Sequence, residues 1–78
     1  MSNEEKYANI FKEILEIEDD QLDGLKYQGV SAWDSVGHMN LIGEIEDSFD
    51  IELETDDVIA FSGYEKGKEI LKKYDIEM

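Results

Sequence analysis

The fold is decided by one segment, residues 33–50, whose sequence is WDSVGHMNLIGEIEDSFD. Asp34 stands before an apolar pattern with the period of a helix, and its carboxylate can accept the backbone amide of Val36 or Gly37 as an N-cap. We therefore predict a helix that begins at Ser35 and ends at about Phe49. The side chains on its core-facing side are His38, Leu41, Ile42, Ile45 and Phe49. Its other side carries Val36, Asn40, Gly43 and Asp47, with Met39 and Glu46 at the borders.

The chain before this segment predicts one helix and one long connection. Ser2 and Glu5 fit a capping box, and the apolar residues that follow have helical spacing over about residues 3–17: Tyr7, Ile10, Phe11, Ile14 and Leu15. Residues 18–33 lose this period and contain two glycines, yet a structureless connection of this length is unusual in a small domain. We expect it to lie over the bundle with a short turn of helix and to bury Leu22, Leu25, Tyr27 and Val30.

The chain after the segment predicts two shorter helices. Thr55 can cap a helix over about residues 55–60. Residues 62–65 form a second capping box, for a last helix that ends near Tyr74, although Gly67 weakens that helix by up to ~1 kcal/mol relative to alanine. The predicted fold is therefore all-α. It is a small four-helix bundle with three main helices, a short third helix and a long loop between the first two, in one domain.

Composition narrows the class of protein. The 78 residues are 41% hydrophobic and include no cysteine, so neither disulfides nor thiolate metal ligands are available. No apolar run approaches the ~20 residues that span a bilayer, and the acidic N-terminus lacks the apolar segment of a secretory signal. With 21 acidic residues against seven basic ones, the net charge of −14 repels nucleic acid and anionic lipid. We expect a cytoplasmic, monomeric protein without nucleic-acid binding or membrane insertion.

The negative charge is concentrated in the middle of the chain. Residues 27–65 hold ten acidic side chains and no Lys or Arg, whereas residues 66–78 hold four lysines against three acidic residues. This asymmetry favours a surface that attracts a basic protein partner, with an attraction that weakens in salt. The alternative is that the charge only keeps the protein in solution, which an even distribution would fit better.

Three roles are compatible with Ser35 at a helix start. As a simple helix-start residue, it would need no further partner. As a nucleophile it would act with His38, one turn away, but Asp34 adjoins the serine instead of standing behind the imidazole that it would have to orient. As an attachment point for an anionic group it would use the free amides and the helix dipole, worth roughly 0.3–1 kcal/mol.

The segment resembles the prosthetic-group region of acyl carrier proteins. Residues 34–36 (DSV) correspond to the family's Asp-Ser-Leu or Asp-Ser-Met motif, and the layout of the following helix matches at 41–42, 45–47 and 49–51. The order of the predicted helices is similar over nearly the whole chain. The resemblance implies that a phosphopantetheinyl transferase attaches phosphopantetheine from coenzyme A to Ser35. The thiol of this group would hold acyl or aminoacyl intermediates as thioesters for partner enzymes, and the protein itself would not be an enzyme.

The resemblance also implies which residues meet partners and cargo. Asp34 would accompany Ser35 at the attachment site. The residues that would face the basic docking surfaces of acyl-loading, aminoacyl-loading and acyl-processing enzymes are Val36, Met39, Glu44, Glu46, Asp47, Asp56 and Asp57. Those that would line an acyl chain folded back into the bundle are Ile42, Ile45, Phe49 and Phe61. Three departures from the family pattern, Trp33, Val36 and Gly43, favour a stand-alone carrier of a dedicated pathway. The cargo stays open among fatty acyl, polyketide, aminoacyl and D-alanyl groups.

Two other possibilities follow from the residues. An acidic adaptor or nucleic-acid mimic would bind a basic protein without any modification of Ser35, and the composition suits it equally well. Residues 19–30 begin like a calcium loop, with oxygen ligands and a glycine at the expected positions: Asp19, Gln21, Asp23 and Gly24. Val30 stands where a bidentate glutamate is needed, so no metal site is predicted.

Overall fold

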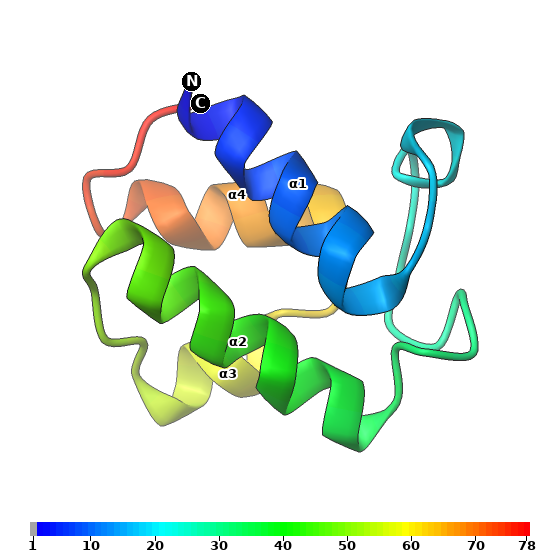
Figure 1. The fold of residues 1–78 in the computed structure, drawn as a ribbon. Helices are drawn as coiled ribbons and strands as arrows, with labels where there is room; N and C mark the ends of the chain where they lie inside the picture. The colour runs from blue at the N-terminus through cyan, green and yellow to red at the C-terminus, as the bar shows by residue number, and fades with distance from the viewer. Residues whose placement is uncertain (1) are drawn as a thin grey trace.

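The computed structural model describes residues 2–78 as a bundle of four α-helices (Figure 1). The elements are α1 (Asn3–Leu15), the short 3-10 helix η1 (Asp19–Gln21), α2 (Ser35–Phe49), α3 (Thr55–Ala60) and α4 (Tyr64–Lys72). In Figure 1, α1 and α4 form the upper half and α2 and α3 the lower half, and the start of α1 lies beside the C-terminal residues at the top, away from the start of α2. The predicted all-α bundle, with a short third helix and a long first loop, is confirmed.

α1 begins as predicted and ends two residues earlier. The Ser2 hydroxyl accepts the Glu5 amide at 3.1 Å, and the Glu5 carboxylate accepts the Ser2 amide at 3.1 Å, which completes the capping box. The helix ends because Glu16 adopts a left-handed conformation with φ of 54°. The Ile17 amide then donates back to the Lys12 carbonyl at 3.1 Å, a bond typical of a helix C-terminus.

The last two helices begin differently from the prediction. α3 has Glu54 and not Thr55 at its N-cap, and no side chain caps it. α4 has Gly63 at its N-cap, so the capping box predicted at Ser62 is wrong. The reason is that the chain before α4 is extended and pairs with the first loop, which leaves Ser62 one residue too early to cap the helix. α4 also ends at Lys72, two residues before the predicted end.

Backbone pairing holds the first loop onto the bundle. The Tyr64 amide donates to the Leu25 carbonyl at 2.8 Å, and the Tyr27 amide donates to the Ser62 carbonyl at 2.9 Å. η1 is the predicted turn of helix. Three of the four side chains predicted to anchor this loop are buried or half-buried, namely Leu22, Leu25 and Val30. Tyr27 is instead 38% exposed, because the pairing holds it at the surface beside the start of α4.

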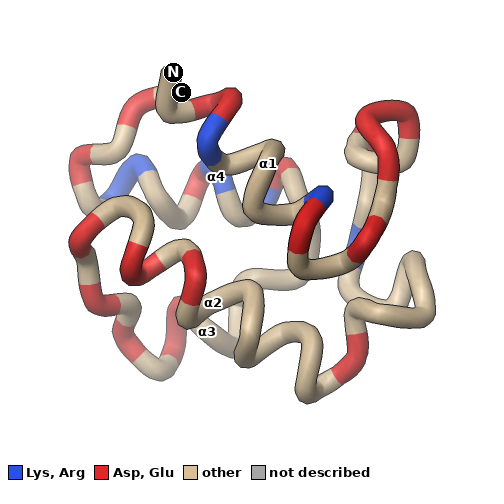
Figure 2. Tube along the Cα trace, in the orientation of Figure 1, with Lys and Arg blue, Asp and Glu red and all other residues tan. Residues whose placement is uncertain are grey.

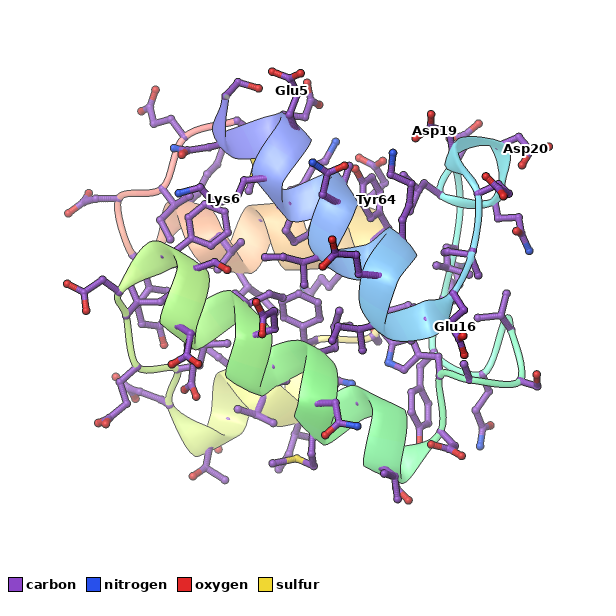
Figure 3. The ribbon with its side chains drawn as sticks, in the orientation of Figure 1. Glu5, Lys6, Glu16, Asp19, Asp20 and Tyr64 are labelled. Atoms are coloured by element: carbon purple, nitrogen blue, oxygen red, sulfur yellow. The ribbon has the colours of Figure 1, made fainter. Side chains whose placement is uncertain are left out.

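One hydrophobic core fills the space between the helices, and aromatic rings occupy its centre (Figure 3). Its largest fully buried side chains are Trp33, Tyr7, Phe11, Phe61, Leu15, Leu41, Ile45 and Leu71. α4 approaches the rings closely because Gly67 has no side chain. A β-carbon there would lie 2.2 Å from Tyr7 Oη and 2.3 Å from Phe61 Cζ. The glycine that weakens the isolated helix is therefore required by its packing.

Candidate functional site at the start of α2

Asp34 and Ser35 divide two tasks at the start of α2. Asp34 Oδ1 accepts the Gly37 amide at 2.8 Å, as predicted for the N-cap. Ser35 is the first helical residue and is exposed, and within residues 2–78 its hydroxyl has no hydrogen-bond partner. Because Asp34 caps the helix, the Ser35 hydroxyl is not needed for that purpose.

Gly37 lets the preceding chain pass close to the first turn of α2. A β-carbon at this position would lie 1.9 Å from the Ala32 carbonyl oxygen, and backbone cannot rotate away as a side chain could. The next residue after Ala32, Trp33, is fully buried in the core. Nothing in the sequence pattern distinguishes Gly37 from Gly43 of the same helix, where an added β-carbon would meet nothing within 4 Å.

A hydrogen-bonded bridge joins the start of α2 to α3. The Trp33 indole Nε1 donates to His38 Nδ1 at 3.0 Å, and His38 Nε2 lies 2.9 Å from the Val58 carbonyl oxygen. An indole N–H can only donate, so Nδ1 is the acceptor and Nε2 carries the hydrogen that is donated to Val58. Both ring nitrogens of His38 are engaged in this bridge, and neither bonds the Ser35 hydroxyl as a nucleophile–base pair would require.

An apolar groove opens beside Ser35 between α2, α3 and the first loop. Its volume is about 320 Å³, and it is lined by Tyr27, Ser35, His38, Met39, Val58, Ile59, Phe61 and Ser62. Four large hydrophobic side chains are exposed within residues 2–78, and three of them line this groove: Tyr27, Met39 and Ile59. The fourth, Val36, follows Ser35 directly. The exposed apolar surface is thus gathered around one serine, which is typical of a binding site.

The groove includes residues that the sequence pattern did not identify. Val36 and Met39 were predicted as exposed contact residues, and both are exposed. Ile59 could not be found from the pattern, because neighbouring helical residues can both face the core, as Leu41 and Ile42 do. Tyr27 could not be found either, because its place depends on backbone pairing with a segment far away in the sequence.

Three of the four residues predicted to line an acyl chain within the bundle do not border this groove. Ile42 and Ile45 are buried in the centre of the bundle and do not border the groove. Phe49 lies at the other end of α2, where the Nζ of Lys6 is 5.0 Å from its ring centroid. Figure 3 shows Lys6 reaching from α1 toward that end of α2. Only Phe61 borders the groove, as part of its floor.

The carboxylates of α2 lie at the end away from Ser35. Glu44 and Asp47 are exposed in its last turns, and Asp56 is exposed at the start of α3. Glu46 differs from these, since its Oε2 accepts the Leu53 amide at 2.8 Å and holds the loop after the helix. Figure 2 shows acidic and uncharged residues along α2 and α3, with the lysines on or beside α1, α4 and the first loop. The negative face is therefore formed by α2 and α3.

Asp57 differs from its prediction as a docking residue. Its side chain is only 10% exposed, with Lys73 Nζ 2.6 Å from Oδ1. The Tyr74 hydroxyl donates to Oδ2 at 2.5 Å. These two hydrogen bonds, from Lys73 and from Tyr74, lower the pKa of the Asp57 carboxyl below its usual value. Asp57 turns inward to tie α3 to the end of α4, whereas its neighbour Asp56 stays exposed.

Neither the rest of the described chain nor comparison with known proteins indicates a function independently of this site. Within residues 2–78, no three His, Asp or Glu side chains are grouped so that they could hold a metal ion, and no helix is long and apolar enough to span a membrane. Comparisons of the chain with protein-family models, with curated proteins and with solved structures gave no match. The residues around Ser35 and their geometry are therefore the basis for a function.

Proposed function

We propose that this protein is a carrier of acyl or aminoacyl groups, with a phosphopantetheine group from coenzyme A attached to Ser35. One observation carries the proposal: the exposed Ser35 hydroxyl has no partner within residues 2–78 and borders an apolar groove. The Asp-Ser motif at the head of an acidic helix, similar to that of acyl carrier proteins, supports the same role. The protein would be a carrier and not an enzyme, and would serve cytoplasmic enzymes.

The residues at this site fit a phosphopantetheine group. A phosphate on Ser35 would lie at the N-terminus of α2, where the first amides have no intrahelical partner and the helix dipole favours an anion. From Ser35 to Gly43 the helix has no acidic residue, and the Asp34 carboxylate is already bonded to the Gly37 amide. The exposed apolar side chain of Val36, directly after Ser35, suits the methyl groups of pantetheine.

The attachment would be a phosphoryl transfer onto the oxygen of Ser35. A bond forms between Ser35 Oγ and the phosphorus next to pantetheine, while the pyrophosphate bond of coenzyme A breaks and adenosine 3′,5′-bisphosphate leaves. A base of the transferase would take the hydroxyl proton, since His38 is engaged with Trp33 and Val58. When bound, the group supplies a terminal thiol that holds the cargo as a thioester.

The face around Ser35 would meet the phosphopantetheinyl transferase and the enzymes that load and process the cargo. Val36 and Met39 offer exposed apolar contact, and Glu44 and Asp47 attract basic side chains. Exposed ion pairs contribute only about 0–1 kcal/mol each. Docking on such a face is therefore reversible, which suits a carrier that visits several enzymes in turn.

Intact-mass measurement after incubation with coenzyme A and a broad-specificity phosphopantetheinyl transferase tests the proposal. The wild type should gain the mass of one phosphopantetheine group, and Ser35→Ala should gain none. Ser62→Ala is the matched control, because it removes another hydroxyl of the same groove and should leave the modification intact.

The rival function, an acidic adaptor or nucleic-acid mimic, predicts a different result. Its basis is the net charge of −14 alone, which needs no chemistry at Ser35. An adaptor would show no added mass in any of the three proteins and would bind its basic partner equally well after Ser35→Ala. A wild type that stays unmodified with several transferases would remove the carrier proposal.

A further inference from the structure

We propose that Trp33 and His38 close the bundle beneath the groove, so that a short apolar acyl group is held on the surface of this protein and not between its helices. This inference rests on the proposed carrier function, and it concerns the fate of the cargo after loading. Two residues that the carrier motif does not include would then decide which cargo the protein shields from water.

The floor of the groove is a continuous layer of aromatic rings. Phe61 is 1% exposed beneath it, and the His38 ring lies 6.3 Å from the Phe61 ring. The Trp33 ring, fully buried, lies nearly parallel to His38 with centroids 6.2 Å apart. Behind Trp33, Phe11 packs edge-on at 5.5 Å. A chain that entered the bundle from Ser35 would have to displace these rings, and close-packed interiors resist such displacement.

Hydrogen bonds hold this layer across the seam between α2 and α3. The bridge from Trp33 through His38 to the Val58 carbonyl begins two residues before α2 and reaches the middle of α3. Separating the two helices would break the bond to Val58. Swinging His38 aside would also leave the buried Trp33 indole without an acceptor, and buried polar groups are rarely left unpaired. Hydrogen bonds therefore hold α2 and α3 together beside Ser35.

The groove above this floor is small and open. Its volume is about 320 Å³, and it is open to solvent along one side. Its walls are the apolar side chains of Met39, Val58 and Ile59, and Ile59 is largely exposed at the edge. A short apolar acyl group, held by a thiol arm that turns back toward Ser35, can lie against these walls. The remainder of a longer chain would project into water.

A length series of loaded proteins tests the inference. The transferase would attach acetyl-, butanoyl-, octanoyl- and dodecanoyl-phosphopantetheine to Ser35 from the matching coenzyme A thioesters, and intact mass would confirm each product. Two readouts follow. One is the rate at which hydroxylamine cleaves the thioester, relative to the same acyl group on free pantetheine. The other is the NMR resonance of the indole N–H of Trp33, the one tryptophan of the chain.

We expect modest protection of the thioester against cleavage, and we expect it to reach its maximum at a short acyl chain length. Butanoyl and octanoyl thioesters should be cleaved about two- to fivefold more slowly than their free counterparts, and dodecanoyl should be protected no further. The Trp33 resonance should stay close to its position in the protein without cargo. Protection that rises beyond about tenfold at dodecanoyl, with a large shift of this resonance, would show entry into the bundle and overturn the inference. No protection at any length would overturn the surface site as well.

Two variants locate the effect. His38→Ala removes the bridge and part of the floor, so protection should now rise with chain length through dodecanoyl. Ile59→Ala is the matched control, since it trims an exposed groove wall and makes no ring contact or hydrogen bond with Trp33 or His38, and it should weaken the protection of butanoyl and octanoyl without adding any at dodecanoyl. The wild-type series decides the question even if His38→Ala does not fold. A protein that never gains mass speaks against the carrier function, whereas a loaded protein with long-chain protection speaks only against the closed floor.

Discussion

The two ends of α2 have different surfaces, although they belong to one continuous helix. Around Ser35 the exposed side chains are apolar and border a groove, whereas in the last turns they are the carboxylates of Glu44 and Asp47. Nine residues separate Ser35 from Glu44, which is about 14 Å along the axis. This exceeds the Debye length of ~8 Å at physiological ionic strength. These carboxylates would therefore repel a phosphate on Ser35 only weakly. A partner that covers both ends of α2 would interact with the phosphate and with the carboxylates.

The two ends are also fixed by different contacts. The first turn is positioned by tight backbone packing, with Gly37 against the Ala32 carbonyl and Asp34 as the cap. The last turns are positioned by polar side chains, since Glu46 bonds the Leu53 amide and the Lys6 ammonium lies 3.3 Å from the Ser48 carbonyl. Tight backbone packing therefore fixes the first turn of α2, where a group would be attached to Ser35. Polar side-chain contacts fix the last turns, where the exposed carboxylates would attract partners.

The largest effect is expected from the two glycines of α2. Gly37→Ala forces a β-carbon into the Ala32 carbonyl, so we expect a loss of stability of about 1–3 kcal/mol or more, as for other overpacked sites. Gly43→Ala meets no neighbour and should raise stability by up to about 1 kcal/mol through helix propensity. Urea unfolding followed by the fluorescence of Trp33 measures both. Similar shifts for the two variants would contradict the tight first turn.

The next effect concerns α3, which forms the outer wall of the groove. Asp57→Asn should destabilise the protein at neutral pH because Lys73 loses its ion pair, whereas Asp56→Asn, at an exposed neighbour, should have little effect. The bonds from Lys73 and Tyr74 lower the pKa of Asp57 in the folded state. Its contribution is therefore fully present above the unfolded carboxyl pKa of about 4 and is lost as the pH falls through the lower native value.

Thermal unfolding as a function of pH checks this assignment. The difference between wild type and Asp57→Asn should be constant from pH 5 to 8 in sign and size, and should shrink below pH 4. A difference that persists unchanged at low pH would mean that Asp57 acts through packing and not through its charge.

Local signals explain what could be predicted. α2 was predicted to begin at Ser35 and to end near Phe49, as observed, because an N-cap aspartate and a helical apolar period are both encoded within it. The position of Ser35 at the first residue of the helix was predicted for the same reason, since it depends only on Asp34 and the helix that follows. The apolar contacts Val36 and Met39 followed from the helical register.

Contacts between distant segments explain what could not be predicted. Gly63 rather than Ser62 begins α4 because residues 25–27 pair with residues 62–64, and no pattern in either segment indicates the other. Asp56 and Asp57 are identical in type and adjacent, and only the approach of α4 decides which one turns inward. The groove has the same origin, because one wall comes from α3 and the first loop, and the carrier motif contains neither.

The smallest effect is expected at the acidic end of α2. Glu44→Lys with Asp47→Lys should slow modification of Ser35 by the transferase about three- to tenfold at low salt, since such exposed charges contribute about 0–1 kcal/mol each and mainly steer the encounter. Glu13→Lys with Glu69→Lys makes the same change in net charge on α1 and α4, and should leave the rate near that of the wild type.

Salt dependence separates a docking face from a general effect of net charge. At about 1 M salt the Debye length is ~3 Å, so the rate of the α2 variant should approach that of the wild type. Equal slowing by both double variants would mean that overall charge attracts the transferase and that α2 has no special part. A rate unchanged in the α2 variant even at low salt would leave recognition to Val36, Met39 and the groove, and the acidic end of α2 would then serve solubility.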